Sequence, residues 1–179
     1  MNPSVALLVL SSIQISRAVV TINFDGEFNS CDNGMDSISW DISKFDILMM
    51  DNENITLDGK FSLIKDFASP TSVKVVLERN SKGMWLPTIT RLIPNFCDVI
   101  DRPHEMWSST VAYFSQRQCP FLAGHEETFD KANIGNMATN MKLPSQMMGE
   151  WRLILEIGTM REAKIEKECL KANFVLEDA

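Results

Sequence analysis

The sequence predicts an all-β fold: an antiparallel sandwich or cup with one amphipathic helix and a long methionine-rich loop, stapled by disulfides. Three observations favour this class. Apolar and polar residues alternate with period two, turn-forming residues separate the alternating runs, and the four cysteines form an even set. With 179 residues, 45% of them hydrophobic and 23% charged, the chain has the size and composition of one domain with a sizeable core.

The first element is a secretory signal peptide, predicted over residues 1–18. An apolar run covers Val5–Leu10, and the small residues Ser16 and Ala18 suit a signal peptidase site. The alternative is an uncleaved membrane anchor, although the run is much shorter than the roughly 20 residues that span a bilayer. We therefore expect a single domain over residues 19–179, without a transmembrane segment in the mature chain.

Strands are predicted next, and the clearest covers residues 55–63. Apolar side chains occupy one parity there and mostly polar ones the other, which is typical of a half-buried strand. Residues 38–49 alternate in the same way but change register after Lys44, which indicates a bulge or bend.

Further alternating runs predict the rest of the sheets. Residues 73–86 favour a hairpin around the turn-forming run Asn80-Ser81-Lys82-Gly83. Residues 151–157 and about 163–174 form two more predicted strands, joined by a turn that begins at Gly158. The total is six or seven strands, with short spacings that favour a sandwich.

The segment from Pro103 to Gln118 interrupts this pattern. Met106, Trp107 and Phe114 recur there at helical spacing, so we expect one amphipathic helix. Residues 119–149 show no clear period, and the sequence predicts a long loop there.

Methionines gather in that loop, and this gathering suggests a function. Their unbranched side chains adapt to variable apolar partners. The stretch from residue 123 to 149 is therefore predicted to be a mobile lid over the mouth of the cup, carried by Met137, Met141, Met147 and Met148. An irregular segment buried permanently against the sheet is the alternative.

Charge and composition argue against several function classes. The formal charge is −7 and the sequence pI is about 4.8, so no nucleic-acid partner is expected. The chain has two histidines without the spacing of a helical metal pair, and it lacks a Gly-x-Ser-x-Gly elbow. We expect no enzyme activity, no catalytic residues, no metal site and no cofactor.

The candidate ligand-binding residues are the inward apolar stripes of the strands, the helix aromatics and the loop methionines. They are Leu57, Phe61, Leu63, Val75, Leu77, Trp107, Phe114, Met137, Met141, Met147, Met148, Trp151, Leu153 and Leu155. If the two sheets are splayed, these side chains line a cavity for an apolar ligand. The alternative is a closed sandwich core made of the same residues.

A secreted chain would meet an oxidising compartment, where four cysteines favour two disulfides. Three pairings are possible from the residues alone. Asn54-Ile55-Thr56 is an acceptor sequence for N-glycosylation at Asn54.

An ordered set of motifs runs through residues 31–175. It comprises Cys31, Trp40-Asp41-Ile42-Ser43, Leu57-Asp58-Gly59-Lys60-Phe61, Asn95-Phe96-Cys97-Asp98, Cys119-Pro120-Phe121-Leu122-Ala123-Gly124, Gly149-Glu150-Trp151-Arg152-Leu153 and Cys169. This set resembles the insect secreted chemosensory proteins of the CheA/CheB type, which are distant relatives of the ganglioside activator protein. The resemblance implies a lipid-binding β-cup, a role in pheromone or taste detection, and the disulfides Cys31–Cys169 and Cys97–Cys119.

Two functions follow as hypotheses. The first is a secreted, non-enzymatic binding protein for an apolar small molecule or lipid, fatty-acid-like or pheromone-like, with the role in insect chemosensation that the resemblance implies. The alternative is an extracellular module that modulates a cell-surface receptor or ion channel without carrying a ligand; an acidic surface and an exposed apolar loop serve both.

Overall fold

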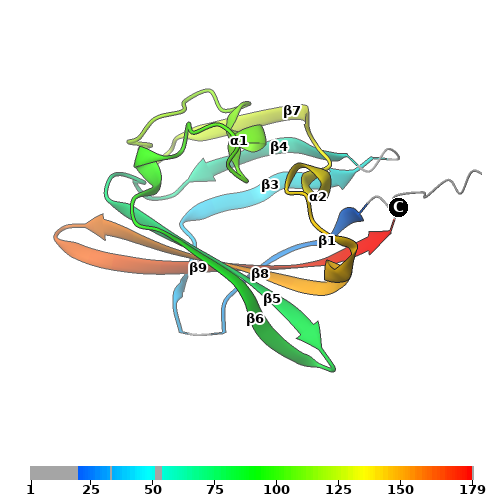
Figure 1. Ribbon diagram of the computed structural model, residues 1–179. Helices are drawn as coiled ribbons and strands as arrows, with labels where there is room; N and C mark the ends of the chain where they lie inside the picture. Colours follow the sequence, from blue (N-terminus) through cyan, green and yellow to red (C-terminus); the bar gives the residue numbers. More distant parts are fainter. Residues whose placement is uncertain (1–19, 33, 51–53, 179) are drawn as a thin grey trace, which may run out of the picture.

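The structure, a computed structural model, describes residues 20–32, 34–50 and 54–178. Two antiparallel sheets lie one above the other, and the helices between the strands are short (Figure 1). The predicted all-β class is confirmed. The predicted signal peptide lies outside the described residues.

The larger sheet contains six strands. Its main path runs β1 (Val20–Ser30), β9 (Lys164–Asp178), β8 (Gly149–Arg161), β5 (Thr71–Ser81) and β6 (Met84–Ile93), and the short β2 (Asp36–Ser37) pairs in parallel with β9. β6 and β1 form the edges of this path. Pro87 lies in the edge strand β6, where a missing backbone donor is tolerated.

The smaller sheet has the order β3 (Trp40–Met49), β4 (Ile55–Leu63) and β7 (Glu126–Gly135). The pairing of β3 with β4 shifts register between Asp41 and Lys44, which confirms the predicted bulge. Gly59 lies opposite, with φ +86° and an ideal Cβ position only 2.0 Å from the carbonyl oxygen of Lys44. Any side chain at this position would collide with the neighbouring strand, so the bulge requires glycine here.

Two tight hairpins connect strands of the larger sheet. Lys82 and Gly83 both have positive φ between β5 and β6, as a two-residue type I′ turn requires, and this confirms the predicted turn. The turn predicted at Gly158 is wrong, because β8 continues to Arg161 and the chain reverses at Glu162 and Ala163. Gly158 instead allows β5 to approach, since its ideal Cβ position is 2.7 Å from Ser72 Oγ.

The helix predicted from Pro103 to Gln118 is reduced to one turn, α1 (Ser108–Val111). Serine, threonine and valine are weak helix formers. The backbone N–H groups of Ser115 and Gln116 also donate to the Glu127 carboxylate, at 2.7 and 3.2 Å, instead of to helix carbonyls. The remaining short helices are η1 (Phe96–Asp98), α2 (Met137–Asn140) and η2 (Ser145–Met147).

The segment predicted as a loop over residues 119–149 is also corrected, because β7 occupies its centre. β7 pairs with β4 along most of its length, so this part of the segment belongs to the smaller sheet. Only the stretch from residue 136 to 148, with α2 and η2, remains as an irregular connection that could act as the predicted lid.

Both disulfides implied by the resemblance are formed. Cys31–Cys169 ties the end of β1 to β9, across a sequence separation of 138 residues. Cys97–Cys119 closes a shorter loop of separation 22, which contains α1. The second disulfide therefore anchors both ends of the segment from residue 97 to 119, here called the cover segment.

Candidate ligand-binding cavity

A cavity of about 360 Å³ lies between the two sheets. Its walls come from the inner faces of β3, β4 and β7 on one side and of β5 and β8 on the other, and the cover segment closes it from a third direction. Eight of the predicted site residues line it: Phe61, Leu63, Val75, Trp107, Phe114, Met137, Leu153 and Leu155.

Aromatic rings form the wall on the smaller sheet. Phe61 of β4 stacks on Trp40 and Phe129 at centroid distances of 5.8 and 6.1 Å, and it meets Phe114 of the cover segment edge-on at 5.8 Å. Such ring contacts add to the energy of apolar burial and fix ring orientation. This wall is therefore preorganised without a ligand.

Aliphatic side chains form the opposite wall on the larger sheet. Val75 of β5, and Leu153 and Leu155 of β8, point between the sheets and line the cavity. Both leucines are only half-buried, although they face inward. Inward side chains that keep accessible surface indicate that the sheets are splayed here and do not close on each other.

The cover segment is held over the cavity by several contacts. The Trp107 indole Nε1 donates to the Ile100 carbonyl oxygen at 3.0 Å, and the ring packs edge-on against Phe96 at 5.0 Å. Arg91 of β6 lies over the same ring, 5.3 Å from its centroid, and pairs with the Glu105 carboxylate at 2.7 Å. The hydrogen bond from Arg91 lowers the pKa of the Glu105 carboxyl, because it favours the charged form.

Three polar residues interrupt the apolar lining: Thr110, His125 and Glu127. The Glu127 side chain is almost fully buried and accepts hydrogen bonds from the backbone N–H groups of Ser115 and Gln116. His125 Nε2 lies 2.8 Å from Glu127 Oε1. This carboxylate therefore holds the end of the cover segment on β7, which accounts for an acidic residue in an apolar wall.

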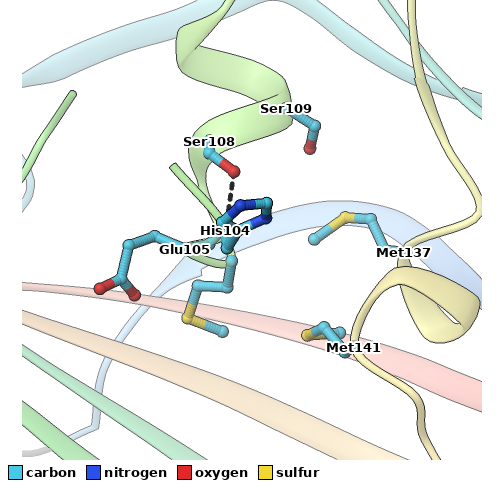
Figure 2. Close-up of a pocket in the computed structure, with 7 residues that line it drawn as sticks. His104, Glu105, Ser108, Ser109, Met137 and Met141 are labelled. Carbon is cyan, nitrogen blue, oxygen red and sulfur yellow. Dashed lines mark hydrogen bonds between the residues drawn. The ribbon is translucent and has the colours of Figure 1, made fainter. Parts of the chain in front are cut away.

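A second hollow of about 480 Å³ lies outside the first. Figure 2 shows its residues: His104, Glu105, Ser108 and Ser109 on the cover segment side, and Met137 and Met141 of the α2 region facing them. Met106 and Met137 line both hollows, so the two meet there. We call them the inner cavity and the outer pocket.

Five predicted site residues lie away from the inner cavity and the outer pocket. They are Leu57, Leu77, Met147, Met148 and Trp151, which pack in the apolar cluster at the other end of the space between the sheets. Met137 and Met141 also contact this cluster, and Met141 lines only the outer pocket. Met147 and Met148 therefore serve as packing, whereas Met137 and Met141 also line a hollow.

Sequence reasoning missed most of the aromatic lining. Trp40, Phe45, Phe67, Phe96, Phe121 and Phe129 all face the inner cavity. The sequence pattern could have identified some of them, because Trp40 belongs to an alternating run and Phe96 and Phe121 lie close to cysteines. Phe129 could not be found in this way, because the charged Glu127 interrupts the inward stripe of β7.

Among the residues that the structure describes, no group of three or more His, Cys, Asp or Glu side chains could hold a metal ion. Within the same part of the chain, no helix has the length and apolar character to cross a membrane. Asn54 lies just before β4 and is half-buried, and the glycosylation of this residue stays a prediction.

No protein-family model matches this chain, and no curated protein matches it. The resemblance to the CheA/CheB type therefore stays a prediction.

Proposed function

We propose that this protein is a secreted, non-enzymatic carrier that binds one apolar small molecule between its two sheets. The observation that carries the proposal is the inner cavity, whose lining is apolar except for Thr110, His125 and Glu127. Pockets that bind small molecules are largely apolar with a few placed polar groups, and this lining has that composition.

The size of the cavity restricts the ligand. Pockets for small molecules usually have volumes of about 300–1,000 Å³, and 360 Å³ is near the lower limit. This volume suits a single alkyl chain or a compact hydrophobic molecule better than a lipid with several chains. A pheromone-like or fatty-acid-like molecule, as the resemblance implies, has this size.

Secretion is part of the proposal, and the two disulfides support it. Cross-links of this kind persist in oxidising compartments and are rare in reducing ones. The predicted signal peptide and the acceptor sequence at Asn54 agree with the same route. A role in chemosensation rests on the resemblance alone.

Native mass spectrometry of protein secreted from cultured eukaryotic cells tests the proposal. We expect a bound mass that organic extraction removes, and saturable binding of the neutral fluorophore phenylnaphthylamine to the extracted protein with one site per chain. The extracted protein after reduction and unfolding is the control. Protein that carries no ligand and does not bind the fluorophore would contradict the carrier function.

An interaction module for a receptor or channel is the second candidate, because apolar side chains are exposed on β6. Met84, Leu86, Ile89 and Leu92 each expose 42% or more of their surface on this edge strand. Exposed apolar groups that gather in this way often mark a contact surface. The substitutions Met84→Lys and Leu92→Lys should abolish activity on a receptor but spare fluorophore binding if this candidate is correct.

A further inference from the structure

The inner cavity and the outer pocket differ in polarity, although they share Met106 and Met137. The inner cavity is lined almost entirely by hydrocarbon. The outer pocket carries the hydroxyl groups of Ser108 and Ser109 and the imidazole of His104, on the side opposite Met137 and Met141 (Figure 2). A ligand that fills both spaces must therefore have an apolar part inside and a polar part outside.

The described lining of the inner cavity offers an acid no permanently charged cationic partner. Among the described residues that line it, none is a lysine or arginine. Its two titratable groups are His125 and Glu127, and they already contact each other at 2.8 Å. A carboxylate placed inside would lose its hydration without gaining a cationic partner, and this is strongly unfavourable.

Glu127 makes the inner cavity still less suitable for an anion. Its two carboxylate oxygens accept from Ser115 N and Gln116 N, and His125 Nε2 lies 2.8 Å from Oε1, so the polar groups on this part of the wall are already paired. The backbone donors on this wall are therefore already used, and a second carboxylate in the same apolar space would lose its hydration without gaining them.

The outer pocket offers hydrogen bonds without an unpaired cation. Ser108 Oγ donates to the Glu105 carbonyl oxygen at 2.7 Å and keeps its acceptor capacity, and Ser109 adds a second hydroxyl. The Glu105 carboxylate is paired with Arg91, which lies outside the lining. Uncharged hydroxyl groups match these partners, since they both donate and accept.

We propose that the ligand is a single-chain amphiphile with an uncharged, hydroxyl-bearing head, such as a long-chain alcohol or a monoacylglycerol. The alkyl chain occupies the inner cavity, and the head lies in the outer pocket among His104, Ser108 and Ser109. This inference rests on the proposed carrier function and adds the chemical class and the orientation of the ligand.

Competition with bound phenylnaphthylamine tests the class of head group. Four competitors share one chain length: glycerol monododecanoate, dodecanol, methyl dodecanoate and dodecanoate. We expect the glyceride and the alcohol to displace the fluorophore at concentrations at least about tenfold lower than dodecanoate, because the acid loses hydration without a cationic partner. The methyl ester lacks both charge and hydroxyl. The concentration at which it displaces the fluorophore should therefore lie between that of the two hydroxyl compounds and that of dodecanoate.

A substitution tests where the head lies. Ser109→Leu fills part of the outer pocket with an apolar side chain and should weaken the glyceride about fivefold or more relative to the methyl ester, because one hydrogen-bonding partner is lost. Ser81→Leu is the matched control, since Ser81 is exposed at the end of β5 and lines neither space. Circular dichroism should show the same strand signal for both variants.

The outcomes separate this inference from the carrier function. If the fluorophore itself does not bind, the carrier function fails. If the fluorophore binds but dodecanoate competes as well as the glyceride, the neutral head is wrong while the carrier function stands. If Ser109→Leu leaves the ratio of glyceride to ester affinity unchanged, the proposed position of the head is wrong.

Discussion

The two ends of the space between the sheets are built from the same strands but differ in packing. At one end, here called the closed end, Trp151 is 1% exposed and its indole Nε1 donates to the Met147 carbonyl oxygen at 2.6 Å. Leu153, two residues along β8 on the same face, is half-buried and lines the inner cavity. β4 shows the same contrast, because Leu57 is buried at the closed end whereas Phe61 is half-buried and lines the inner cavity.

The contacts across the space account for this difference. At the closed end, α2 lies between the layers near the C-terminus (Figure 1), and Ala138 and the neighbouring methionines fill the gap. Around the inner cavity, rings on one sheet face aliphatic side chains on the other without filling the space. Alternation thus decides which side chains face inward, and the connecting segments decide whether those side chains meet.

The largest expected effects come from the two disulfides. Loss of Cys31–Cys169 by serine substitution at both positions should lower the free energy of unfolding by roughly 5 kcal/mol, and loss of Cys97–Cys119 by roughly 3 kcal/mol, because the loops differ in length. Urea unfolding measures both.

The affinity for phenylnaphthylamine should change in the opposite order. Loss of Cys97–Cys119 should lower this affinity more than loss of Cys31–Cys169, because only Cys97–Cys119 anchors the cover segment. Fluorophore binding, measured at a temperature where both variants are folded, checks this order. A greater loss of affinity in the Cys31 and Cys169 variant would contradict the role given to the cover segment.

Matched leucine truncations compare the two ends directly. Leu57→Ala removes a packed side chain at the closed end and should cost about 4 kcal/mol, whereas Leu153→Ala removes a half-buried side chain beside an existing hollow and should cost about 2 kcal/mol. Urea unfolding with unchanged m-values provides both numbers. Equal losses would mean that the inner cavity is filled in solution.

Acid should destabilise the protein partly through Glu168, a buried residue that lines neither hollow. Burial raises the pKa of its carboxyl, but hydrogen bonds from Ser39 and Arg161 outweigh this, and the net pKa is lowered. A lowered pKa in the folded state stabilises the protein above the pKa of the unfolded state, and this contribution is lost as the pH falls below about 4.5.

The variant Glu168→Gln tests this assignment. In this variant the free energy of unfolding should fall less between neutral and acid pH than in the unmodified protein, as measured by urea unfolding across this pH range. Glu162→Gln is the control, because Glu162 is exposed in the turn between β8 and β9. An equal fall in Glu168→Gln and the unmodified protein would rule out the assignment.

Amide hydrogen exchange should show a smaller contrast around α2. Residues 136–148 lack long strand pairing and should exchange faster than β7, which directly precedes them and is paired with β4. Bound dodecanol should slow exchange near Met137, because this residue lines both hollows. Strong protection of this stretch without ligand would contradict the remaining lid.

Local signals were sufficient to predict much of the fold. The alternation of β4, the bulge near Lys44 and the Lys82-Gly83 turn are encoded within a few residues. β1 was not predicted, although Val20, Ile22 and Phe24 alternate at its start. The cover segment could not be predicted, because Ser115 and Gln116 bond to a carboxylate that follows them by more than ten residues.

The candidate site was predictable only in part, for a related reason. Leu153 and Trp151 share one parity, so the sequence places both inward but does not distinguish lining from packing. That distinction depends on how far the sheets splay, and this is set by contacts between distant segments. The outer pocket depends on the same contacts, since it forms between the cover segment and α2.

Two tryptophan substitutions on β8 test whether the inner cavity is a ligand site. Leu153→Trp places a large ring in the inner cavity, whereas Ile154→Trp places the same ring on the opposite face of β8. We expect Leu153→Trp to lower phenylnaphthylamine affinity at least about tenfold by occupying the space, with stability close to that of the unmodified protein. Ile154→Trp should leave this affinity unchanged. Equal affinity in both variants, with both folded, would contradict a ligand site in the inner cavity.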